Sequence, residues 1–211
     1  MPPARDARFA ALPAVSFHAL EAGGTRAALR LYEADGTLSR GALSALSHLC
    51  RDFRRGAEVP MAPRALQLVY KAAVHFGGAQ AQIVSGYRAP SRRGDTSHHA
   101  VGEAIDFRLA GIGSREVAQY VRRFGRVGVG YYPRVDFVHL DVRDASYFWV
   151  NRSRAGRHGW DRPLPRRGAV RDEEAWTPEW DLPWFEPTIA PVDSAARADF
   201  VPRSQRRRRR R

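Results

Sequence analysis

The sequence predicts an α+β domain in which a small antiparallel sheet is flanked by helices. Segments that alternate apolar and polar residues, as strands do, lie among segments with helical spacing. The two kinds of segment do not alternate strictly, as they would in a parallel βαβ sheet. A turn signal at Pro133-Arg134 separates the last two strand-like segments and indicates an antiparallel pair.

The first half of the domain supplies a hairpin and two helices. Residues 25–39 alternate in polarity around the turn signal Asp35-Gly36 and predict a β-hairpin. Apolar residues recur three or four positions apart in residues 40–55 and again in 62–76, which predicts two amphipathic helices. The second helix is expected to end at Gly77-Gly78.

The second half is richer in strands. One further amphipathic helix is expected over residues 114–124, and a loop over residues 87–97. The expected strands cover residues 81–86, 102–109, 126–132 and 136–142.

The two ends of the chain differ in character from the middle. Residues 1–24 are rich in Ala and Pro and are expected to be loosely held, while residues 151–211 combine Pro, Trp and charge without either period. We therefore place the domain at residues 25–150. The net charge is +13, but seven arginines lie in residues 203–211, so the rest of the chain carries 13 − 7 = +6. Charge alone therefore does not make the domain a nucleic-acid module.

Composition excludes several classes of protein. The single cysteine, Cys50, rules out an internal disulfide and a cysteine-based zinc cluster. No apolar run of about 18 residues is present, so no membrane span is expected. The N-terminus shows no continuous apolar core of a signal peptide.

Polar residues gather in two expected strands and the loop before one of them. In "EAIDFRL", alternation places Asp106 on the face opposite Ile105. In "DFVHLD", the same alternation places His139 and Asp141 on one face. A loop histidine, His99, completes a set that can converge on one point.

Two imidazoles and one carboxylate are the ligand set of a catalytic zinc site, because they leave a fourth tetrahedral position open. Gly102 would let the loop return tightly between the first two ligands. A chance spacing of polar residues is the alternative, and spacing alone does not decide between the two.

The motif "SHHAVGEAID" fits the Ser-x-His-x-x-Gly-x-Ala-x-Asp signature of the zinc D-alanyl-D-alanine peptidase family. Residues 25–149 resemble its murein endopeptidase K branch. The similar segments are "IVSGYRAP", "AIDFRLAGI", "GVGYYPRVDFVHLDV" and "SYFW". The resemblance implies a hedgehog/D-Ala-D-Ala-peptidase-like zinc domain. The segment between "SGYR" and "SHH" is shorter than is usual in that branch, which leaves substrate specificity open.

The resemblance also implies roles for particular residues. It makes His99, Asp106 and His139 the zinc ligands, and Arg88 the group that stabilises the developing oxyanion. Two carboxylates compete for the role of general base. Asp136 lies three residues before the last histidine, as the base does in several branches. Asp141, which shares a face with His139, is favoured, with orientation of the imidazole as its alternative role.

The implied function is hydrolysis of peptidoglycan peptides by zinc-activated water in the periplasm or cell envelope. Because no signal peptide is evident, a cytoplasmic role is left open. One alternative is a zinc-containing module that binds the cell wall without cleaving it. The other is a protein that contacts polyanions or nucleic acid through the arginines of residues 203–211. No oligomeric state is predicted.

Overall fold

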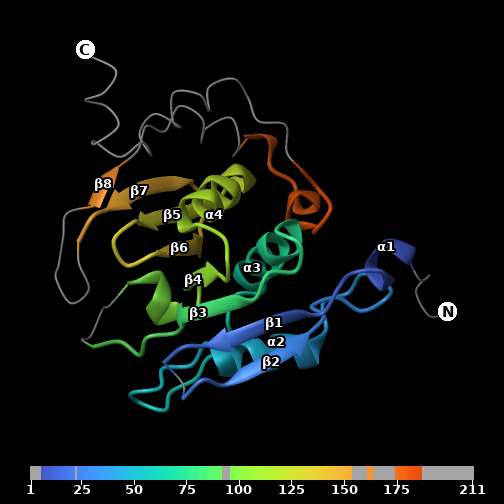
Figure 1. The fold of residues 1–211 in the computed structure, drawn as a ribbon, viewed down its shortest axis with the longest axis horizontal. Helices are drawn as coiled ribbons and strands as arrows, with labels where there is room; N and C mark the ends of the chain where they lie inside the picture. The colour runs from blue at the N-terminus through green and yellow to red at the C-terminus, as the bar shows by residue number, and fades with distance from the viewer. Residues whose placement is uncertain (1–5, 22, 92–95, 154–160, 164–173, 187–211) are drawn as a thin grey trace.

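The computed structural model describes residues 6–21, 23–91, 96–153, 161–163 and 174–186. Within these residues the chain forms one mixed sheet with helices packed against it (Figure 1). In chain order the elements are α1 (Ala7–Ala10), β1 (Val15–Ala19), β2 (Arg26–Leu29), α2 (Arg40–Leu49), α3 (Pro63–His75), β3 (Ala81–Ser85), η1 (His98–Val101), β4 (Ala104–Leu109), α4 (Ser114–Val121), η2 (Arg122–Phe124), β5 (Val127–Tyr132), β6 (Phe137–Val142), β7 (Tyr147–Asn151), β8 (Asp161–Pro163) and η4 (Pro178–Asp181).

The sheet is larger than the sequence predicted, and it is not purely antiparallel. Among the described residues it has eight strands in the order β2-β1-β3-β4-β6-β5-β7-β8. Strands β1 and β3 run parallel, as do β5 and β7, while the other neighbours are antiparallel. The α+β class is confirmed, and the expectation of a small antiparallel sheet is corrected to a mixed one. Strands β1 and β3 can run parallel because a long connection, which includes α2 and α3, separates them in the chain. This connection brings the chain back to the end of the sheet at which β1 began.

Strand β1 comes from a segment expected to be loosely held. Val15 and Phe17 are almost fully buried, and the strand pairs with both β2 and β3. A five-residue strand flanked by Ala and Pro carries too short an alternation to stand out in sequence. Within the expected hairpin over residues 25–39, β2 pairs with β1, and only the bridge between Tyr32 and Leu38 forms across the turn.

The expected helix over residues 40–55 ends early. Helix α2 stops at Leu49, and residues 50–57 form a loop closed by a bridge between Asp52 and Ala57. The carboxylate of Asp52 accepts the main-chain N–H groups of Arg54 and Arg55, and this local bonding competes with helix continuation.

One face of the central strands β4 and β6 packs into the apolar core, and the other face carries polar side chains. Ile105 and Phe107 of β4 and Leu140 of β6 are fully buried, in a core to which α3 and α4 contribute. The alternate residues of the same strands, including Asp106 and His139, point to the other face. The core therefore fixes which face of the sheet carries the polar residues. Each described helix is too short or too polar to cross a membrane.

Residues 174–186 pack against α3 through two cations. The Nζ of Lys71, the only lysine, donates to the carbonyls of Trp180 and Phe185 and lies 4.0 Å from the Phe124 ring centroid. Burial lowers the pKa of Lys71 to about 7. These contacts hold part of the expected C-terminal tail against the domain.

The second cation, Arg64, forms a buried ion pair with Asp181. Its Nε donates to Oδ2 at 2.7 Å, and a second N–H donates to Oδ1 at 3.2 Å. The guanidinium also donates to three carbonyls of residues 124–126. Asp181 is only 4% exposed, so the pair is removed from solvent screening.

We expect Asp181→Ala to lower the free energy of unfolding by about 2–4 kcal/mol, because Arg64 would stay buried without its carboxylate partner. Urea unfolding followed by tryptophan fluorescence measures this loss. The matched control is Glu174→Ala, an exposed acid of the same segment, which should leave the midpoint unchanged. Equal midpoints for both variants would contradict the assigned role of the ion pair.

Candidate metal centre

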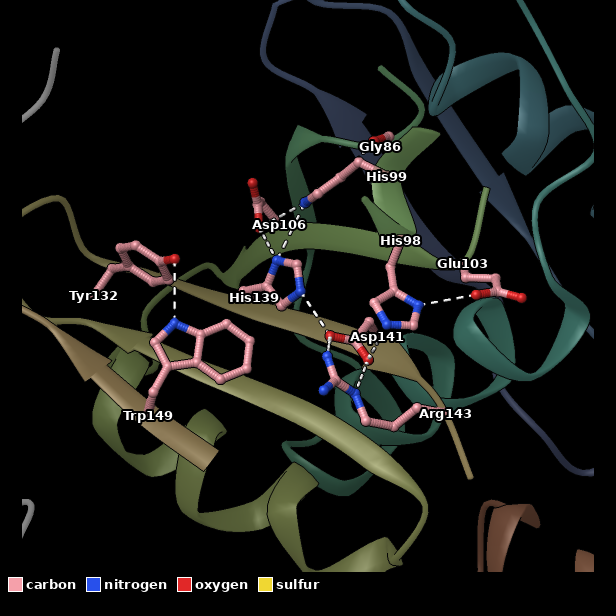
Figure 2. A network of polar contacts seen from close by, with 10 residues as sticks. All are labelled: Gly86, His98, His99, Glu103, Asp106, Tyr132, His139, Asp141, Arg143 and Trp149. Atoms are coloured by element: carbon pink, nitrogen blue, oxygen red, sulfur yellow. Dashed lines mark hydrogen bonds and ion pairs between the residues drawn. The ribbon is translucent and has the colours of Figure 1, made fainter. Parts of the chain in front are cut away.

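Three side chains from separate elements converge on the face of the sheet that carries Asp106 and His139. The register of β4 and β6 places Asp106 directly opposite His139, and His99 comes from η1 (Figure 2). The Nδ1 of His139 lies 2.8 Å from Asp106 Oδ1 and 3.1 Å from His99 Nε2. His99 Nε2 lies 3.4 Å from the same carboxylate oxygen. The three residues expected to act as ligands therefore form a tight triangle, called here the triad.

The second nitrogen of each imidazole has a fixed partner outside the triad. His99 Nδ1 lies 2.6 Å from the carbonyl oxygen of Gly86, which can only accept a hydrogen bond, so this nitrogen carries the proton. His139 Nε2 lies 2.9 Å from Asp141 Oδ2 and donates to it in the same way. The lone pairs of His99 Nε2 and His139 Nδ1 consequently face each other and the carboxylate of Asp106.

Three acceptor atoms in one buried place require a cation or a proton between them. Burial alone would raise the pKa of Asp106, but the two imidazoles outweigh it and hold that pKa well below its usual range. Burial alone would lower the pKa of His139, but Asp106 and Asp141 outweigh it and raise the pKa to about 9. Without a metal, a proton on His139 satisfies this requirement.

The triad also fits a zinc ion. Bonds of about 2.0–2.1 Å at tetrahedral angles would put neighbouring ligand atoms about 3.3 Å apart. The three separations of the triad, 2.8, 3.1 and 3.4 Å, lie around this value. Two nitrogens and one oxygen, all within 4.8 Å of one another, are a donor set that zinc accepts.

Asp141 lies beneath His139 and is fully buried. Besides His139 it contacts Arg143, whose Nε donates to Oδ1 at 2.5 Å and whose terminal nitrogen donates to Oδ2. Burial raises the pKa of Asp141, but His139 and Arg143 outweigh it and lower that pKa strongly. A carboxylate held in this way keeps its charge and accepts a further proton poorly.

The structure does not bring Asp136 to the triad. This residue lies in the exposed turn between β5 and β6, with a φ of 53°. It lines a separate hollow with Gln82 and Arg108. Within the described part of the chain, no hydrogen bond or ion pair links it to a triad residue.

Arg88 lies beside the triad, three residues beyond the end of β3. Its main-chain N–H donates to the carbonyl of His99 at 3.1 Å, and its side chain is exposed. Burial raises the pKa of the nearby Tyr132 to about 12, and the positive charge of Arg88 opposes this rise. Residues 92–95, part of the loop expected to be short, lie outside the described residues.

An aromatic wall borders the triad and was not predicted as part of the site. The Trp149 indole lies 5.1 Å from the His139 ring and donates to the Tyr132 hydroxyl at 3.3 Å. A Cβ built on Gly130 would meet this indole at 2.5 Å, so the glycine makes room for it. Glycines at alternate positions of "GVGYY" are the sequence signal for such packing.

His98 and Glu103 form a second imidazole–carboxylate pair at the edge of the triad. His98 Nδ1 lies 2.9 Å from Glu103 Oε2, and its Nε2 lies 3.9 Å from Asp141 Oδ1. Both side chains are partly exposed. The pair borders the triad without joining it.

Comparison with known proteins agrees with this geometry. The chain matches the family described as peptidoglycan L,D-endopeptidase MepK over residues 13–147. It is 34% identical over 112 residues to the probable peptidoglycan L,D-endopeptidase MepK of Haemophilus influenzae, covering 47% of this chain and 60% of the relative. It is 29% identical over 117 residues to the peptidoglycan L,D-endopeptidase MepK of Escherichia coli K12, covering 50% of this chain and 64% of the relative.

The chain thus spans less than two thirds of the length of these relatives. The family match nevertheless covers more than half of the chain and contains the whole triad. It confirms the resemblance drawn from the motifs, and the chain belongs to the family of the peptidoglycan L,D-endopeptidase MepK.

Proposed function

We propose that this chain is a zinc-dependent metallopeptidase that hydrolyses peptide bonds of peptidoglycan. The observation that carries the proposal is the triad, in which three acceptor atoms face one another in a buried place and both imidazoles are oriented by outside partners. The names of the relatives support a bond between an L- and a D-residue as the one cleaved. They also support action in the cell envelope, where peptidoglycan lies.

In this proposal His99, Asp106 and His139 hold the metal. Zinc, when bound, supplies Lewis-acid chemistry, because it polarises a peptide carbonyl and lowers the pKa of a water molecule toward about 7. The carbonyl of Gly86 accepts a hydrogen bond from Nδ1–H of His99, which keeps the proton on that nitrogen and leaves the metal-facing Nε2 unprotonated.

Arg88 is proposed to stabilise the negative charge that develops on the carbonyl oxygen of the substrate. Its main chain is bonded to the carbonyl of His99, so its position is tied to that of a ligand. Its exposed guanidinium can reach a bound peptide, and a fixed positive charge there is most effective in the transition state.

We assign Asp141 to positioning His139. Three observations support this role over that of a general base: full burial, the ion pair with Arg143 and the lowered pKa. A carboxylate that accepts a hydrogen bond from an imidazole N–H fixes the tautomer and orientation of the ring.

A second candidate function is favoured by the same contacts. Asp136 lies in an exposed turn away from the triad, and Asp141 is occupied by Arg143, so neither expected base is free beside the metal position. A zinc-containing module that binds the cell wall without cleaving it would need no such base. Residues 203–211 lie outside the described residues, and contact with polyanions through them stays a prediction.

The decisive test is release of peptides from purified peptidoglycan sacculi. We expect the zinc-loaded protein to release new peptides, identified by mass spectrometry, and expect a chelator or His99→Ala to abolish release. Sacculus binding, with one zinc per chain and without product, would instead support the binding module. Products that persist after chelation would contradict metal dependence.

Asp141→Asn separates the positioning role from the role of base. If Asp141 positions His139, the variant should bind zinc about 10–100-fold more weakly in a competition titration. If Asp141 were the base, zinc affinity would be kept while kcat fell. Asp136→Asn is the companion variant. A loss of kcat there, at unchanged zinc affinity, would make Asp136 the base.

NMR titration of the metal-free protein tests the charge state of the triad. The imidazole of His139 should titrate well above the usual value near 6.5, at about pH 9, because Asp106 and Asp141 stabilise its charged form. Below that pH a proton competes with the metal, so apparent zinc affinity should fall as pH falls. One equivalent of zinc should remove the transition, and a midpoint unchanged by zinc would exclude His139 as a ligand.

A further inference from the structure

A pocket of about 510 Å³ lies beside the triad, between the loop of residues 51–55 and the segment of residues 83–91. Gly86 belongs to the wall of the pocket, and its carbonyl holds His99. Arg88 and Ala100 also line it. The pocket and the triad therefore share one stretch of backbone, and a peptide bound at the triad has the pocket as its neighbour.

The wall of this pocket is held by the loop opposite. The Asp52 carboxylate accepts the N–H of Ala89 at 2.9 Å, and Arg55 donates to the carbonyls of Ala89 and Pro90 at 2.8 Å each. The carbonyl of Cys50 accepts the N–H of Tyr87 at 2.7 Å. These bonds pin the segment before a ligand arrives, so little ordering is left for binding.

Gly86 shows how closely the two segments approach. A Cβ built on it would lie 2.4 Å from the Cβ of Cys50 and 2.5 Å from its carbonyl oxygen. No side chain fits there without movement of the backbone. This wall of the pocket is thus fixed by the main chain.

The lining of the pocket is basic. It contains four arginines and two acids, and one of these acids, Asp52, is bound to main-chain N–H groups. Arg55 is likewise occupied by two carbonyls. The other acid, Glu21, forms an exposed ion pair with Arg54 at 3.9 Å, a separation too long for a hydrogen bond.

Arg51 and Arg54 keep donors for a ligand. One N–H of Arg51 donates to the carbonyl of His48 at 2.7 Å, and its guanidinium lies 4.0 Å over the Phe53 ring. The side chain is therefore held in place, while its other N–H groups have no acceptor among the residues that the structure describes. Arg54 has no hydrogen-bonded side-chain partner in the same set.

We propose that this pocket binds a free carboxylate of the peptide substrate, through Arg51 and Arg54, next to the bond that is cleaved. The proposal rests on the proposed function and adds a determinant of specificity to it. An arginine offers several N–H groups in a plane, which match a carboxylate but not a neutral amide. Arg88 stays with the triad and is not part of this pair.

The experiment uses disaccharide-peptide dimers released from sacculi, in two forms. One form keeps its free carboxylates, and in the other they are converted to primary amides with a carbodiimide and ammonia. We expect the zinc-loaded wild-type chain to show a KM on the order of tenfold lower for the free form, with similar kcat. The double variant Arg51→Gln/Arg54→Gln should lose this preference, because the carboxylate loses both partners.

Arg40→Gln is the matched control. It removes an exposed arginine at the other end of α2 and should keep the full preference. Arg54→Gln alone, which breaks no described hydrogen bond, keeps the test valid if the double variant misfolds, and it should lose part of the preference. No preference in the wild type, or an undiminished one in the Gln variants, would overturn the proposal.

Calorimetry measures binding of the dimers to protein from which a chelator has removed the metal. This measurement separates the present proposal from the proposed function. The free-carboxylate dimer should bind the wild type on the order of tenfold more tightly than it binds the double variant, whether or not it is cleaved. Equal binding would refute the pocket. If the zinc-loaded protein cleaved neither dimer but this difference in binding remained, only the proposed peptidase activity would be refuted.

Discussion

The antiparallel register of β4 and β6 is the constraint on which the candidate site depends. It places Asp106 opposite His139 because Ile105 and Leu140, their partners in the next pair, are buried in the core. A shift of one residue in either strand would turn its polar side chains into the core and its apolar ones outward. The hydrophobic core therefore holds the two sheet-borne members of the triad in place through the register of the two strands.

The third member, His99, depends on a different part of the fold. It lies on η1, outside the sheet, and its ring is held by the carbonyl of Gly86. The turn after η1 needs Gly102, which has a φ of 76° and whose Cβ would meet the Pro60 carbonyl at 2.9 Å. The loop that follows α2 and the segment after β3 thus act together to complete a site begun by two strands.

The strand-borne residues of the site could be predicted from the sequence, but elements that depend on distant partners could not. Alternation of period 2 predicted which face carries Asp106, His139 and Asp141, because one face of each strand is apolar. It did not predict β1, whose five residues lie in Ala- and Pro-rich surroundings and are defined by pairing with β3. Long-range partners decide such elements, and a single sequence does not display them.

The ion pair of Asp141 and Arg143 beneath the triad could also have been predicted from the sequence. Arg143 follows His139 and Asp141 at the same period of two, just beyond β6. In β5 the residues directly opposite Asp141 and His139 are Gly128 and Gly130. A Cβ on Gly128 would lie 2.2 Å from the Asp141 carboxylate, just as one on Gly130 would meet Trp149.

Two glycines in the interior of a strand weaken it, because they lose more backbone entropy on folding and bury no side chain. Here each gives space to a group that touches His139, either the Asp141 carboxylate or the Trp149 ring. In "VGVG" of β5, glycine stands at the two positions opposite His139 and Asp141 of "HLD". The missing side chains leave the space in which β6 can carry a buried and oriented imidazole.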